Sequence, residues 1–274
     1  MRTAGFNARA IAAALVIALP LFAQVADGDR AYETRANGTI DAAIAAYSRA
    51  IAANPNDLVA HARLLRAYRF KGAYVAKSAE EKKKVYATAK TAGEQALRAV
   101  VKTLGVKEDA PEKTVAAAAR KHLGAADVYL WDAINWGEWA LAYGKMAAAR
   151  QGAADRIKRG ATIAQLTDPR LENGSPSRVL GRLHDQTPRI PFVTGWASSK
   201  EAVRFLEESR KYDPANKLTA VFLAEALVSN DSSSKPRAIQ LLREAIAAPV
   251  DPKFAVEDAA AIADAKALLR KWGA

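Results

Sequence analysis

The stretch AIAAYSRAIAANP, residues 43–55, decides the fold. In this stretch Tyr47 follows Ala43 by four positions, Ala50 follows Tyr47 by three, and Pro55 follows Ala50 by five. The stretch AVRFLEESRKYDP, residues 202–214, repeats this spacing with Leu206 and Ser209 in the middle positions. Small residues at helical spacing let two helices approach closely, the larger residue fills the groove between them, and proline ends the helix. A third copy of the first part occurs at residues 238–245.

The residues that follow each proline also repeat. Leu64, Tyr68 and Gly72 follow Pro55 at offsets that Leu223, Leu227 and Asp231 reproduce after Pro214. This pattern resembles the tetratricopeptide repeat (TPR), an antiparallel helix pair of about 34 residues. We therefore predict an all-α, TPR-like α-solenoid over residues 27–274. The clearest repeats are 27–72 and 178–248, and a polar-faced capping helix covers 254–272. The alternative is an ordinary alanine-rich bundle whose periodicity arises by chance.

Composition favours helices and excludes several kinds of site. Half of the 274 residues are hydrophobic, alanine is abundant, and only 7% are aromatic. The absence of cysteine excludes a disulfide scaffold, a thiolate zinc site and a cysteine nucleophile. Three histidines leave little room for a metal site, and no hydrolase motif or phosphate-binding glycine loop occurs. We therefore expect neither a metal, nor a cofactor, nor an enzyme.

Residues 1–26 are typical of a secretory signal peptide. Arg2 and Arg9 supply a positively charged region before a 14-residue apolar run at 10–23, and cleavage is expected after Ala23 or Ala26. The run is shorter than the about 20 residues that a membrane span needs, and the alternative is an uncleaved anchor. We expect a periplasmic or secreted protein with no stable membrane span in its mature form. Because ATP is absent outside the cytoplasm, kinase-like and ATPase functions are disfavoured.

The middle of the chain is less regular than its ends. Residues 75–101 predict one long basic helix or two, and residues 115–152 predict a helix pair. A loop is expected at 171–177 and a long irregular insertion at 187–199, since both stretches are rich in glycine, proline or serine.

The stretch 126–272 resembles the T component of TRAP transporters, a family of periplasmic helical-repeat proteins. The resemblance is carried in order by Leu130-Trp131, by Ile134 to Trp139, by Leu180 to Leu183, by 202–214 and by Phe222 to Leu227. It implies a solute-binding protein as partner, a trimer with a central passage, and a cleft for a hydrophobic ligand. That family is commonly lipid-anchored through a cysteine, which this chain lacks.

Four aromatic residues form a candidate binding stripe. Tyr129, Trp136 and Tyr143 lie seven residues apart on one helix face, and Trp139 lies beside them. Such a stripe either stacks an apolar ligand or packs in the core between helix pairs. Gly137 next to Trp136 predicts a close backbone approach, which favours packing.

A second candidate site combines arginines with aromatic residues. Arg178 and Arg182 share a helix face, and Arg189 follows in the insertion. Three guanidinium groups can clamp a carboxylate or a phosphate, and pairing with nearby carboxylates is the alternative. Phe192 and Trp196 flank this region, and function concentrates on such loops.

The lysines between residues 77 and 90 form a charged helix face. Interspersed Glu80 and Glu81 favour a solvated face, and a basic patch that meets anionic lipid or an acidic partner is the alternative. Nucleic acid is not expected as a partner, because the basic residues are spread along the chain and no recognition motif occurs.

Two functions stay open at this point. The first is an exported, non-catalytic scaffold for protein–protein interaction, as a monomer or a homo-oligomer, which serves a solute-binding protein or transporter. The second is a small-molecule carrier that binds an apolar ligand in an aromatic-lined cleft.

Overall fold

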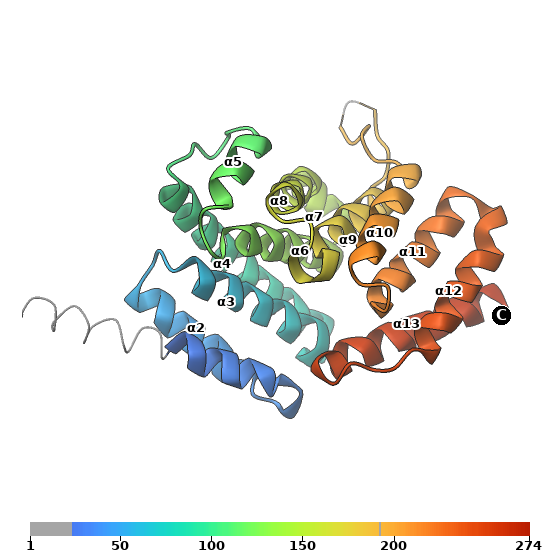
Figure 1. Cartoon of the computed structure of the whole chain (residues 1–274), viewed down its shortest axis with the longest axis horizontal. Coiled ribbons are helices and arrows are strands. Elements are labelled where there is room, and N and C mark those ends of the chain that lie inside the picture. Colours follow the sequence, from blue (N-terminus) through green and yellow to red (C-terminus); the bar gives the residue numbers. More distant parts are fainter. Residues whose placement is uncertain (1–23, 192) are drawn as a thin grey trace, which may run out of the picture.

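The structure is a computed structural model that describes residues 24–191 and 193–274. In these residues it contains helices and no strands, which confirms the all-α prediction. A first helical segment at 24–33 is followed by the helices α2 to α13 (Figure 1). Their bounds are α2 Ile40–Ala53, α3 Leu58–Phe70, α4 Ala79–Leu104, α5 Glu112–Ala119, α6 Ala125–Tyr143, α7 Lys145–Arg150, α8 Ala153–Thr167, α9 Leu171–Gln186, α10 Ser199–Tyr212, α11 Lys217–Asn230, α12 Lys235–Ala247 and α13 Ala255–Trp272.

The helices pack in sequential pairs, and the pairs stack on one another. Pairs form between α3 and α4, α6 and α8, α9 and α10, and α11 and α12. The first helices of these pairs are also neighbours, because α3 contacts α6, α6 contacts α9, α9 contacts α11, and α11 contacts α13. Figure 1 shows the pairs following an arc, and α13 begins near the N-terminal helices and runs away from them to the C-terminus.

The two matching sequence stretches form matching structures. After Pro55, the side chain of Asp57 accepts a hydrogen bond from the Ala60 amide and caps α3. After Pro214, at the same offset, Asn216 caps α11 through the Thr219 amide. Proline therefore ends one helix, as predicted, and the structure adds that the polar residue two positions later caps the next helix.

The small and large residues of the pattern are buried as predicted. Tyr47 of α2 and Leu206 of α10 have no exposed side-chain surface, and their alanine neighbours at 43 and 202 have none either. Each large side chain lies against a glycine of the preceding helix, Gly28 or Gly181. A Cβ atom built there would lie 2.4 Å from the Tyr47 ring or 2.5 Å from Leu206. Glycine is thus required by the close approach of the two helices.

The middle of the chain differs in detail from the prediction. Residues 79–104 form one basic helix, α4. Residues 115–152 do not form a helix pair: they contribute to α5, α6 and α7, and α5 packs against α8. The expected loop at 171–177 is shorter, since regular helix resumes at Ser175 after three residues with positive φ.

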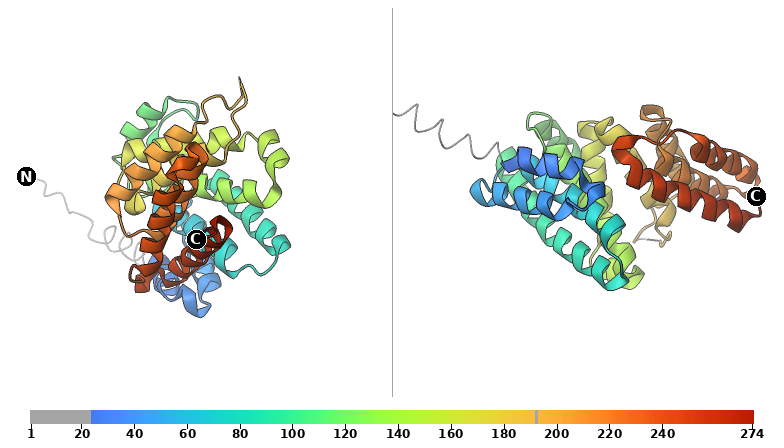
Figure 2. Two further views of the ribbon diagram at one scale, coloured as in Figure 1. Left: turned by 90° about the vertical axis from the view of Figure 1, so that its right-hand side faces the viewer. Right: turned by 90° about the horizontal axis from the view of Figure 1, so that it is seen from below.

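The C-terminal helix closes the arc. The helix α13 has a narrow buried stripe, made by Ala261, Ala265 and Leu269. Its other positions are less polar than predicted, because they hold more apolar residues than charged ones. At the opposite end of the chain, buried Arg35 donates to Glu257 of α13 at 2.8 Å and to the Lys253 carbonyl. The two ends of the arc are therefore tied together, as the views in Figure 2 also show.

The predicted signal peptide lies almost wholly outside the described residues. Of residues 1–26, the structure describes only 24–26, which begin the first helical segment. Val25 packs against the first core cluster, beside Tyr32 and Tyr47. Among the helices in 24–191 and 193–274, none has the length and apolar character of a membrane span.

Candidate functional site

A row of cross-helix ion pairs runs along the first helices of the stacked pairs. The pairs join the segment 24–33, α3, α6, α9 and α11, and their side chains are 18% to 38% exposed. We call these residues the ion-pair face. Its pairs are Arg63–Asp29 at 3.3 Å, Arg66–Glu172 at 3.8 Å, Arg69–Glu138 at 3.5 Å and Arg182–Glu225 at 2.7 Å.

The helix α3 supplies the cations of one half of this face. Arg63, Arg66 and Arg69 follow one another at intervals of three, so they project from one side of the helix. The guanidinium of Arg66 lies 4.1 Å from the ring centre of Tyr32, and Arg69 donates to the Tyr74 hydroxyl at 2.7 Å. These aromatic contacts hold Arg66 and Arg69 in fixed positions while part of each side chain reaches solvent.

Glu172 meets α3 from a strained turn. Glu172 and Asn173 have φ values of 45° and 58°, in the left-handed region that residues other than glycine seldom adopt. The turn places the Glu172 carboxylate beside Arg66, and Asn173 donates to Asp213 at 3.2 Å. Each non-glycine residue in this conformation costs about 1–3 kcal/mol of conformational free energy, and such residues cluster at functional sites. The start of α9 is therefore a candidate part of a functional site.

Arg178 is a cation without a carboxylate partner. It donates to Thr219 Oγ1 at 3.2 Å and to Ser175 Oγ at 2.9 Å, and no described carboxylate lies within ion-pair distance. Burial, followed by the neighbouring positive charge of Arg69, lowers the pKa of Arg178 to about 10. The group still carries its charge at neutral pH, so it can accept an anionic group of a ligand.

The three arginines predicted as a clamp are only partly brought together. Arg178 and Arg182 both project from α9 toward α11, as their spacing predicts. Arg182 is already paired with Glu225 and with Asp185, which is the structural alternative for this residue. Arg189 is exposed in the insertion, and no described contact joins it to the other two.

The predicted aromatic stripe lies mostly in the core. Tyr129, Trp136 and Trp139 are 7%, 1% and 6% exposed, and they pack among α4, α6, α8 and α9. Lys90 of α4 lies over both tryptophan rings, 4.8 and 5.1 Å from their centres. Tyr143 alone reaches the surface, stacked on Trp139. This burial favours core packing over stacking of a ligand.

The close backbone approach predicted at Gly137 of α6 does not occur. A Cβ atom at Gly137 would meet its nearest neighbour, Ile157 Cδ1, at 4.0 Å, so no close backbone approach occurs there. The close contact of α6 lies instead at Gly160 of α8, where a Cβ would lie 2.9 Å from the Tyr129 carbonyl.

The insertion at 187–198 is anchored by Trp196. Its ring lies edge-on to His184, 5.2 Å between centres, and Lys158 lies 4.7 Å above it. His184 in turn stacks on Phe205, so the tryptophan fixes the insertion to α8, α9 and α10. Phe192 lies outside the described residues.

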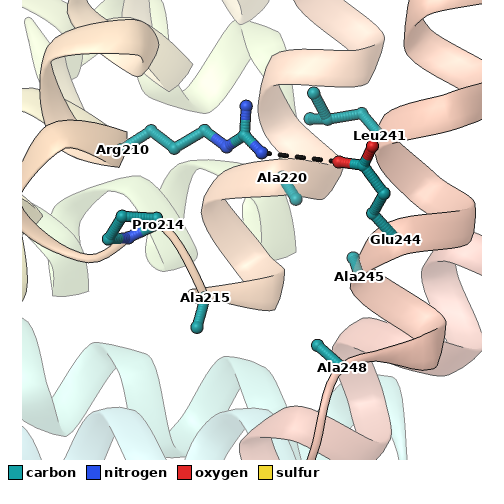
Figure 3. A pocket seen from close by; sticks show the side chains of 8 residues that line it. All are labelled: Arg210, Pro214, Ala215, Ala220, Leu241, Glu244, Ala245 and Ala248. Carbon is teal, nitrogen blue, oxygen red and sulfur yellow. Dashed lines mark ion pairs between the residues drawn. The ribbon is translucent and has the colours of Figure 1, made fainter.

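Two hollows of the described surface are small. Figure 3 shows one of about 140 Å³ between the α10–α11 turn and α12, where Arg210 and Glu244 lie 3.6 Å apart. Another, of about 210 Å³, is lined by His61, Arg98 and Lys102. Pockets for small molecules usually span about 300–1,000 Å³. No group of three or more metal-binding side chains occurs in the part of the chain that the structure describes.

The α3 arginines and their partners were not among the site residues predicted from the sequence. The three-residue spacing of Arg63, Arg66 and Arg69 was a visible signal, but the partners Glu138 and Glu172 lie about 70 and 106 residues further along the chain. Their proximity arises from stacking of the helix pairs, which a local pattern does not encode.

Comparison with known proteins does not assign the chain to a family. No family model matches the chain, and no curated protein is significantly similar to it. The resemblance to the TRAP T component therefore stays a prediction from the sequence.

Proposed function

We propose that this chain is an exported, non-catalytic scaffold of TPR-like helix pairs, and that its ion-pair face binds a protein partner. The repeated caps after Pro55 and Pro214 support the TPR-like interpretation. The matching glycine contacts of Tyr47 and Leu206 support it as well. In a solenoid, the helices that face inward together offer one extended surface for a partner segment.

The observation that carries the proposal is the row of ion pairs on successive first helices. Partly exposed pairs contribute only about 0–1 kcal/mol each to folding, so stability alone gives little reason for four of them in a row. A row of fixed, partly exposed charges does, however, give specificity and register to a polypeptide with complementary charges.

The environment of Arg178 indicates which chemical group the partner presents to this face. Among the described residues, Arg178 has no carboxylate at ion-pair distance, and its guanidinium donates only to the Thr219 and Ser175 hydroxyl groups. We therefore propose a partner segment that presents a carboxylate to Arg178. The resemblance to the TRAP T component supports an extracytoplasmic solute-binding protein as this partner.

We do not propose that this chain carries an apolar small molecule. Trp136 and Trp139 are covered by neighbouring helices and offer no surface to a ligand. The hollow beside Arg210 and the one beside His61 are also smaller than the usual ligand pocket.

The test compares charge reversals on two faces. Arg66→Glu with Arg182→Glu reverses two paired arginines of the ion-pair face, and Arg204→Glu with Arg237→Glu reverses two paired arginines elsewhere. Tagged proteins are recovered from the cell envelope under identical conditions, after circular dichroism has verified that each is folded. We expect the same partner with wild type and the control pair, and its loss with the first pair. Failure of wild type to retain any reproducible partner, or equal recovery with both pairs, contradicts the proposal.

A further inference from the structure

We propose that the end of the molecule formed by the start of α4 and by the α6–α7 corner docks on an anionic phospholipid surface. The two parts meet because α4 and α6 run antiparallel: Tyr143 near the end of α6 donates to the Lys83 carbonyl near the start of α4. Figure 2 shows this end projecting to one side of the arc. We call it the basic tip, residues 77–84 and 141–151.

The tip exposes apolar side chains that no other part of the described chain covers. Leu141 is 70% exposed, Met146 is 69% exposed and Tyr143 is 39% exposed. Leu141 and Met146 lie on either side of Gly144, where α6 ends and α7 begins, so they share one corner. Large apolar side chains at this exposure are costly in water unless another phase receives them.

The tip also carries unmatched positive charge. It holds six cations and two carboxylates, and none of the six takes part in an ion pair with a described residue. The cations are Lys77, Lys82, Lys83, Lys84, Lys145 and Arg150. One of the two carboxylates, Glu81, is engaged in the cap of α4, where it accepts the Lys77 amide hydrogen at 2.7 Å. On the ion-pair face, by contrast, each of the four arginines is paired with a carboxylate.

An anionic bilayer uses both features of the tip. Lysine and arginine are attracted to phosphate headgroups, and leucine, methionine and tyrosine partition into the layer just below them. An acidic protein would use the cations but would not need Leu141 and Met146. The combination therefore favours a lipid surface, with binding that is peripheral and weakened by salt. This inference does not depend on the proposed protein partner, because it concerns another face.

The experiment measures partition onto vesicles. Protein purified from its producing cell, with the N-terminus verified by mass, is sedimented with vesicles of phosphatidylglycerol and phosphatidylethanolamine or of phosphatidylcholine alone. The first variant carries Lys82→Glu, Lys84→Glu and Lys145→Glu. Its control reverses three exposed cations without described ion pairs, namely Arg243, Lys266 and Lys271. A second variant, Leu141→Ser with Met146→Ser, is matched by Leu123→Ser with Val193→Ser, which are 85% and 64% exposed.

We expect binding to the anionic vesicles that high salt abolishes. Since each lysine near an anionic surface is worth about fivefold, the three tip reversals should lower the partition coefficient by about 100-fold or more. The serine pair at the tip should also weaken binding, and both controls should bind far more tightly than their tip counterparts. Absence of binding to anionic vesicles, or equal loss in tip and control variants, overturns the proposal. Binding of soluble polyglutamate without vesicle binding assigns the tip to an acidic protein and overturns it as well.

Discussion

A buried carboxyl group in the core makes the stability of this protein depend on pH. Asp132 of α6 is 6% exposed, and its Oδ1 atom has no hydrogen-bond partner. It faces Gly93 of α4, where a Cβ atom would lie 1.9 Å from this oxygen. Burial raises the pKa of Asp132 from 3.8 to about 7, against the opposing positive charge of Arg156 and with a small contribution from Glu94. We predict that Asp132→Asn stabilises the protein at pH 8.

The sign and size follow from proton linkage. Between pH 4 and pH 7 the folded state binds more protons at this site than the unfolded state, so the free energy of unfolding falls as pH rises. A shift of about 3 pH units, at about 1.36 kcal/mol each, gives an upper limit of about 4 kcal/mol at pH 8. Asparagine has nearly the same shape and does not ionise, so the variant should lack this decline.

The assay is urea unfolding from pH 4 to pH 8, followed by far-ultraviolet circular dichroism. The quantity of interest is the difference between the variant and wild type, because other groups titrate equally in both. Asp264→Asn, at an exposed position of α13, serves as the control and should match wild type throughout. A difference that stays constant with pH, or a variant less stable than wild type at pH 8, would refute the reasoning.

Three further predictions concern packing and maturation. In urea unfolding, Gly181→Ala should lower the free energy of unfolding by about 1–3 kcal/mol, because the added methyl group overpacks the contact with Leu206. Gly137→Ala, which has open space around it, should leave the free energy of unfolding unchanged or raise it by up to about 1 kcal/mol. Arg35→Ala should cost about 3 kcal/mol and speed hydrogen exchange at both ends of the arc, because it leaves a carboxylate of α13 without its partner. If a signal peptide is removed, intact mass should place the new N-terminus at Gln24, since cleavage after residue 26 would remove Val25 from the core.

The helical class and the repeat register were predictable from the sequence. The spacing of alanine, a large residue and proline is local, and it sets both the buried stripe of a helix and the point where the helix ends. The buried stripes of α2 and α10, and the ends of both helices just before Pro55 and Pro214, confirmed this reasoning. The bounds of the C-terminal helix were also predicted nearly to the residue, since 254–272 was expected and α13 covers Ala255–Trp272.

The middle of the chain and the candidate site could not be derived in the same way. The short helices α5 and α7 are set by packing against α8 and α6, not by their own patterns. The contact between Arg35 and Glu257 spans 222 positions of sequence and depends on the curvature of the whole stack. An aromatic residue at helical spacing has the same pattern in a core as in a cleft, so the burial of Trp136 required the structure.

Photo-crosslinking in the producing cell tests the binding role of the ion-pair face most directly. A photoreactive phenylalanine analogue is placed at Arg63 or at Glu225, two partly exposed positions at opposite ends of the face, and at exposed Arg243 of α12 as control. The account predicts that illumination links the same protein partner to positions 63 and 225 and not to position 243. Absence of any adduct at the ion-pair face, or identical adducts from all three positions, would contradict it.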